Sequence, residues 1–172
     1  LHRTPGDIDF VVAPDDFDRT MAVMENIGKV DHGLIHEHHG MAWVDGVTVE
    51  PHYKVHNYQR PTTDRAMPEM FASVFPFELI DADMDGYAVP VFPPTFESVF
   101  LISHMVNHLY EEGLGLRQVV DYAMFLAKCA DRIDWMQHHE WLYRMQMERA
   151  WRIFTCICVE YLGLPLPSQV EP

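Results

Sequence analysis

The chain has 172 residues, of which 48% are hydrophobic and 22% are charged. This composition argues against a disordered chain. The length suffices for one substantial domain or two small lobes. Twelve basic residues stand against 26 acidic ones, a formal net charge of −14, which argues against general nucleic-acid binding because that depends on Lys and Arg. No run of 18 apolar residues is present, so no membrane span is expected. The three cysteines form no CxxC pair, so reduced thiols in a cytoplasmic protein are predicted.

The first predicted elements are a strand and a helix. Residues 8–13 are rich in β-formers and end at Pro14, which predicts a strand. Asp15 and Asp16 offer an N-cap for a following helix of about a dozen residues. Gly28 ends the apolar stripe of that helix.

A set of strands is predicted next. Residues 33–39 and 41–44 have β character, and Asp45-Gly46 is a strong hairpin signal. Residues 47–55 form a longer strand with period-2 alternation. The first third therefore predicts a β-α-β-β-β lobe with a mixed or antiparallel sheet.

The rest of the chain divides into an irregular and a helical part. Six prolines interrupt residues 56–94, where Asp83-Met84-Asp85-Gly86 predicts a turn between short strands. Thr95 is expected to cap a helix that ends near Glu112. Three further helices are predicted at 116–130, 134–147 and 149–162. The predicted architecture is α+β, with an α/β lobe at 1–94, an all-helical lobe at 95–172 and the active cleft between them.

Two carboxylates at the start of the first strand are the most informative feature. Alternate side chains of a strand share a face, so Asp7 and Asp9 project together, about 7 Å apart. Glu50 lies in the second apolar strand, and it converges with them if the two strands are neighbours. Three carboxylates repel one another unless a cation such as Mg²⁺ lies between them. For an isolated Asp-x-Asp pair the simpler interpretation is a solvated strand edge.

Several segments together resemble a known family. They are Arg3-Thr4-Pro5-Gly6-Asp7-Ile8-Asp9, Val49-Glu50-Pro51-His52, His104-Met105-Val106-Asn107-His108 and Leu116-Arg117-Gln118-Val119-Val120-Asp121. In order and type they resemble the DNA polymerase β-like nucleotidyltransferases, and more narrowly the bacterial uncharacterised nucleotidyltransferase family. The resemblance covers nearly the whole chain.

The resemblance implies a two-ion site. Asp7 and Asp9 would hold two Mg²⁺ (or Mn²⁺) ions about 4 Å apart. Glu50 would bind only the ion that activates the attacking hydroxyl, while the other ion accompanies the triphosphate. The same three residues are the candidate catalytic groups. The candidate substrate-binding residues are Arg3, Gly6, His52, His104, His108 and Arg117.

One expected motif is missing from the sequence. The superfamily carries a Gly-Ser turn that holds the nucleotide phosphates ahead of the first carboxylate strand, and no such turn lies between Leu1 and Gly6. We expect it in residues upstream of Leu1, and we expect the chain without it to be inactive. A degenerate family member is the alternative.

Several histidines and one arginine admit a structural role. His104 and His108 are four residues apart on one helix, where a structural role is favoured over metal ligation. Arg117 either pairs with Asp121 or reaches a substrate phosphate. Exposure on a strand, rather than metal binding, is expected for His36, His38 and His39.

The favoured function is Mg²⁺-dependent transfer of a nucleoside monophosphate from an NTP to a hydroxyl of a small molecule or protein. One alternative is a catalytically silent nucleotide-binding or regulatory protein of antitoxin type. Another is a metal-dependent phosphohydrolase, which would release phosphate rather than pyrophosphate.

Overall fold

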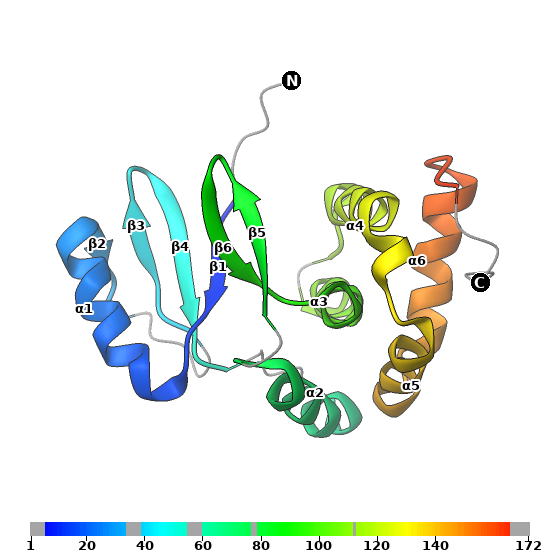
Figure 1. Cartoon of the computed structure of the whole chain (residues 1–172), viewed down its shortest axis with the longest axis horizontal. Coiled ribbons are helices and arrows are strands. Elements are labelled where there is room, and N and C mark those ends of the chain that lie inside the picture. Colours follow the sequence, from blue (N-terminus) through cyan, green and yellow to red (C-terminus); the bar gives the residue numbers. More distant parts are fainter. Residues whose placement is uncertain (1–5, 34–38, 55–59, 77–78, 112, 166–172) are drawn as a thin grey trace. The chain divides into compact units, whose positions relative to one another are not determined.

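The computed structural model describes residues 6–33, 39–54, 60–76, 79–111 and 113–165 (Figure 1). The fold is α+β, as predicted. The chain forms two compact units, Leu1–Gln59 and Arg60–Pro172, and each is described by itself below. No helix in these described ranges is both long and apolar enough to cross a membrane.

The first unit contains a four-stranded mixed sheet, which confirms the predicted sheet type. Its strands are β1 (Ile8–Val11), β2 (Lys29–Val30), β3 (Ala42–Val44) and β4 (Val47–His52). The order is β1-β4-β3-β2, with β1 parallel to β4 and the other neighbours antiparallel. The predicted strand at 33–39 lies largely outside the described residues. The two-residue strand β2 is too short to leave a periodic pattern, and the sequence did not predict it.

A helix follows β1, but it begins differently from the prediction. A 3-10 turn, η1 (Pro14–Asp16), leads directly into α1 (Phe17–Ile27). Asp16 at the N-cap position has helical backbone angles, and its side chain makes no capping hydrogen bond. The predicted side-chain cap is therefore wrong, because the extended conformation that an N-cap needs is replaced by a turn closed through Asp16 N–H and the Ala13 carbonyl, 2.9 Å apart.

Gly28 ends α1 as predicted, although for a different physical reason. Its backbone is extended rather than left-handed. A Cβ atom at this position would lie only 2.3 Å from the Trp43 carbonyl oxygen. Glycine is therefore required by the close approach of the helix end to β3.

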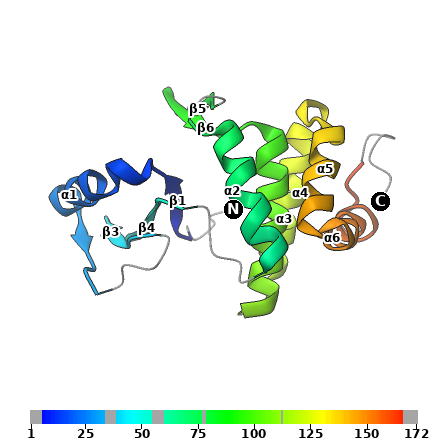
Figure 2. The ribbon, with the colours of Figure 1, turned by 90° about the horizontal axis from the view of Figure 1, so that it is seen from below.

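The helix α1 covers one face of the sheet (Figures 1 and 2). A Cβ atom at Gly40 would lie 2.6 Å from the Met21 sulfur of α1, so position 40 faces this helix. On β4 the buried residues Val49 and Pro51 alternate with the less buried positions. Residues of the opposite parity project from the other face, which is where the polar side chains of the sheet lie.

Two tight turns confirm the hairpins predicted from the sequence. Asp45 and Gly46 have φ values of 50° and 83°, and Asp85 and Gly86 have values of 54° and 88°. Two successive positive φ values are typical of the type I′ turn, which explains the Asp-Gly pairs. The second turn joins the strands of a separate antiparallel hairpin, β5 (Ile80–Met84) and β6 (Tyr87–Val91).

The second unit is mainly helical. Its helices are α2 (Pro61–Val74), α3 (Pro94–Glu111), α4 (Leu116–Cys129), the 3-10 turn η2 (Ala130–Arg132), α5 (Trp135–Met145) and α6 (Glu148–Glu160). The last three α-helices confirm the predicted ones to within two residues at each end. Within this unit α5 lies beside both α2 and α3 (Figure 1).

Helix α2 was not predicted, because the prolines of this region indicated breaks. Pro61 stands in the first turn of the helix, where a missing N–H costs nothing. Pro68 stands inside the helix on its exposed side. Met67 and Met70 are at most 2% exposed, so their burial stabilises the helix despite the interrupted hydrogen bond.

The sequence predicted that Thr95 caps α3. This prediction is wrong, because Thr95 lies within the first turn of that helix. Its hydroxyl oxygen instead accepts a hydrogen bond from the Asp134 N–H at 2.9 Å. The Asp134 carboxylate in turn accepts hydrogen bonds from Met136 N–H and Gln137 N–H, both at 3.1 Å. Thr95 thus positions the residue that caps α5.

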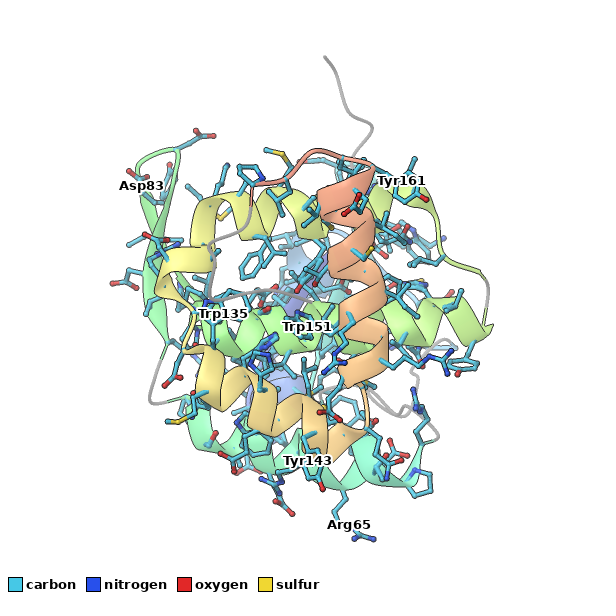
Figure 3. The ribbon with its side chains drawn as sticks, turned by 90° about the vertical axis from the view of Figure 1, so that its right-hand side faces the viewer. Arg65, Asp83, Trp135, Tyr143, Trp151 and Tyr161 are labelled. Carbon is cyan, nitrogen blue, oxygen red and sulfur yellow. The ribbon has the colours of Figure 1, made fainter. Side chains whose placement is uncertain are left out.

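The core of the second unit lies between its helices. Trp135 and Trp151 lie toward the middle of the unit, whereas Arg65, Tyr143 and Tyr161 project outward (Figure 3). Trp151 is 2% exposed, and its ring lies 5.6 Å from the ring of His138, measured between centroids.

Candidate metal-binding site

The pairing of β1 with β4 brings the predicted acidic residues together. The two strands are parallel, and their register places Asp9 opposite Glu50 and Val11 opposite His52. Laterally paired residues of a sheet project from the same face. A backbone hydrogen bond of 2.9 Å from Val12 N–H to the His52 carbonyl continues this pairing beyond the strand.

Three carboxylates converge at this edge of the first unit. One carboxylate oxygen from each of Asp7, Asp9 and Glu50 lies within 4.8 Å of the other two. The side chain of Asp9 is 50% exposed and that of Glu50 is 16% exposed. Like charges at this separation repel, and a hard divalent cation with oxygen ligands relieves that repulsion. The donor set therefore suits Mg²⁺ or Mn²⁺.

His52 lies against two of these carboxylates. Its Nε2 atom is 3.0 Å from Asp9 Oδ1, within hydrogen-bonding distance, and 4.0 Å from Glu50 Oε2. The backbone of His52 is held in place because the residue ends β4 and pairs with neighbouring segments on both sides. The structure thus places His52 where it restrains the orientation of the Asp9 carboxylate.

His39 also lies at this candidate site, where the sequence did not place it. It was predicted to be exposed, and this is wrong, because the residue is only 8% exposed. It faces His52 across an isolated antiparallel bridge, and its Nε2 atom lies 3.5 Å from Glu50 Oε2. The sequence feature that could have located His39 is the Asp45-Gly46 turn. A hairpin that pairs Val44 with Val47 pairs residue 39 with residue 52 when the register is continued.

The comparison with known families shows to which family the chain belongs. A sequence model of the uncharacterised nucleotidyltransferase family matches residues 1–163. The chain belongs to this family. No curated protein and no solved structure matches the chain. Membership supports nucleotidyl transfer as the general activity, with a nucleotide as one substrate.

The remaining predicted site residues of this family member lie on several elements. Gly6 precedes β1, whereas Arg3 lies outside the described residues, as do His36 and His38. Three other candidates belong to the second unit, where each is described only within its own helix. Arg117 is exposed in the first turn of α4.

The structure does bring His104 and His108 together on α3. Their Nε2 atoms are 2.9 Å apart, a hydrogen-bonding distance. The ring of Phe100 stacks on His104 with 5.9 Å between centroids. Glu97 falls near the same helix face by its spacing, and burial raises the pKa of its carboxyl to about 7. The sequence suggested no perturbed acid at this position.

Proposed function

We propose that this protein is a Mg²⁺- or Mn²⁺-dependent nucleotidyltransferase that moves a nucleoside monophosphate from an NTP to a hydroxyl group. The observation that carries the proposal is the convergence of Asp7, Asp9 and Glu50 within 4.8 Å in a member of a nucleotidyltransferase family. Family membership supports the general reaction, and the oxygen donors support the class of cation.

The side chains of the cluster have two parts in the proposed chemistry, binding the cation and orienting its ligands. Asp7, Asp9 and Glu50 would hold the divalent cation, which when bound offsets phosphate charge and lowers the pKa of a coordinated hydroxyl. β1 and β4 hold Asp9 and Glu50 at a shared sheet face, and Asp7 directly precedes β1. The hydrogen bond from His52 restrains Asp9, so less reorganisation is needed when substrate binds.

The net charge of the chain limits the chemical classes that could accept the nucleotide. A formal net charge of −14 disfavours a long polyanion as the group that receives the nucleotide. We therefore infer a small-molecule or protein hydroxyl as acceptor. Arg117 is the proposed phosphate contact, because a guanidinium donates paired hydrogen bonds to phosphate oxygens.

The direct test follows the nucleotide and the leaving group together. The protein expressed from its natural gene is incubated with each NTP, labelled at the α-phosphate, in the presence of Mg²⁺ or Mn²⁺. We expect pyrophosphate release and a labelled acceptor from cell extract, both abolished in Asp9→Asn. Asp18→Asn is the matched control, because Asp18 is an exposed acid on α1 away from the carboxylate cluster.

The possible outcomes separate the alternatives. Release of inorganic phosphate without pyrophosphate would identify a phosphohydrolase instead. NTP binding without any turnover would identify a silent nucleotide-binding protein. Equal pyrophosphate release by wild type and Asp9→Asn would remove Asp9 from the site.

A further inference from the structure

A second group of metal-ligand side chains adjoins the carboxylate cluster. One ligand atom from each of His39, Glu50 and His52 lies within 4.8 Å of the other two. Two of these three donors are imidazole nitrogens, whereas Asp7 and Asp9 offer only oxygen. We propose that His39, Glu50 and His52 form a second cation site, which binds a divalent transition ion of the Zn²⁺ type and shares Glu50 with the carboxylate cluster.

The backbone holds the two histidines in register. His39 and His52 are partners in an antiparallel bridge. The Gly40 N–H donates to the Pro51 carbonyl at 3.0 Å, and on the other side Val12 N–H donates to the His52 carbonyl at 2.9 Å. Both rings therefore start from paired backbone segments, which is what a preorganised ligand set requires.

The distances resemble those between ligands around one ion. Nε2 of His39 is 3.5 Å from Glu50 Oε2, and Nε2 of His52 is 4.0 Å from the same oxygen. Ordinary N–H···O hydrogen bonds span about 2.7–3.2 Å, which is shorter than both separations. Bonds of about 2.0–2.2 Å in a tetrahedral zinc site place neighbouring ligand atoms roughly 3.4 Å apart. Small side-chain adjustments would close the set around an ion.

The His39, Glu50 and His52 cluster differs from the carboxylate cluster both in solvent exposure and in the type of its ligand atoms. The side chains of His39, Glu50 and His52 are 11%, 16% and 16% exposed, whereas that of Asp9 is 50% exposed. Mg²⁺ keeps several waters and prefers oxygen ligands, which suits the exposed end. Imidazole nitrogens favour Zn²⁺ and similar ions, which lose water more readily. The buried end is therefore the transition-ion site.

A competing role for the imidazoles is to orient the carboxylates by hydrogen bonding. In the metal-free protein His52 Nε2 lies 3.0 Å from Asp9 Oδ1 and orients that carboxylate by a hydrogen bond, which the same nitrogen would exchange for the ion when Zn²⁺ binds. Both roles would change nucleotidyl transfer, so activity does not distinguish them. Only the ligand role requires that the protein bind Zn²⁺ through these two rings.

The test measures Zn²⁺ binding directly, without nucleotide. Metal-free protein competes with a chromogenic chelator for Zn²⁺. We expect wild type to bind Zn²⁺ at this site and at least tenfold weaker binding in His39→Gln and in His52→Gln. Asp18→Asn and His104→Gln are matched controls, because they alter an exposed acid on α1 and the other histidine pair, and their Zn²⁺ affinity should stay within twofold of wild type.

A measurement on the unaltered protein keeps the proposal testable if a variant fails to fold. X-ray absorption of the protein loaded with one equivalent of Zn²⁺ should show two imidazole ligands and at least one oxygen ligand. A spectrum without imidazole scattering would overturn the site, as would equal Zn²⁺ affinity in wild type and both histidine variants.

This site shares Glu50 with the proposed catalytic cluster but does not depend on nucleotidyl transfer. Zn²⁺ binding through His39 and His52 in a protein that transfers no nucleotide would refute the proposed function alone. Transfer that needs Asp9, in a protein whose Zn²⁺ binding ignores both histidines, would refute the second site alone.

Discussion

The negative charge of Asp9 has two opposite effects in the proposed site. It attracts a cation, and it repels the neighbouring carboxylates when no cation is bound. We expect Asp9→Asn to change the free energy of unfolding of the metal-free protein by less than about 1 kcal/mol, since lost repulsion offsets a weakened hydrogen bond with His52. The rise in melting temperature on adding Mn²⁺ should shrink, because binding to the folded state contributes that rise. Thermal melts with and without Mn²⁺ measure both effects. Full Mn²⁺ stabilisation together with full activity in the variant would show that Asp9 is not a ligand.

Arg117 offers a test of the proposed phosphate contact. Arg117→Ala should weaken nucleotide binding by about 1.5–3 kcal/mol, the range for a hydrogen bond to a charged group. Lys128→Ala, at an exposed position of the same helix, should leave the affinity unchanged. Isothermal titration with a non-hydrolysable NTP gives the values. Unchanged affinity with a lower melting temperature would assign Arg117 to a structural pair on α4.

At this scale the sequence predicted the carboxylates and missed one histidine. Strand alternation predicted that Asp7 and Asp9 project together; Asp7 directly precedes β1, and the adjacency of β1 and β4 brings Glu50 to both carboxylates. His39 was missed because its partner is 13 residues away along the chain, and only the hairpin register connects the two. Local periodicity carries no information on such a pairing.

At the scale of elements, propensity predicted well where packing agreed with it. The helices after α3 have apolar stripes with a helical period, and all three were found. α2 was missed because two prolines mark breaks in an isolated segment, whereas burial of Met67 and Met70 outweighs one lost hydrogen bond here. The predicted cap at Thr95 was wrong because of a tertiary contact. The Thr95 hydroxyl accepts a hydrogen bond from Asp134 N–H at the start of α5.

α5 carries a buried histidine that should make stability depend on pH. His138 is fully buried, and neither ring nitrogen has a hydrogen-bond partner within the described part of the chain. Burial, with a smaller effect from the charge of His139, lowers the pKa of His138 to about 3. The unfolded chain, with an ordinary pKa near 6.5, therefore binds more protons below that pH than the folded protein.

The contribution of His138 is fully present above about pH 6.5 and is lost as the pH falls toward 3, by up to about 1.4 kcal/mol per pH unit. His138→Phe keeps an aromatic ring beside Trp151 and should flatten this slope. Urea unfolding between pH 7 and pH 5 measures it, and His32→Gln, at an exposed position, is the control. An identical slope in wild type and His138→Phe would show that folding does not lower the pKa of His138.

At the scale of the whole molecule, charge bears on the acceptor more than any single residue does. A chain with 26 acidic and 12 basic side chains repels a phosphate backbone except where cations intervene. We expect no measurable binding of duplex DNA at 0.15 M salt, with a Kd weaker than about 10⁻⁴ M, the weak end of non-specific binding. Fluorescence anisotropy of a labelled duplex, with and without Mg²⁺, measures this. Saturable micromolar binding would move the acceptor class from small molecules and proteins to nucleic acids, and it would do so without contradicting the carboxylate site.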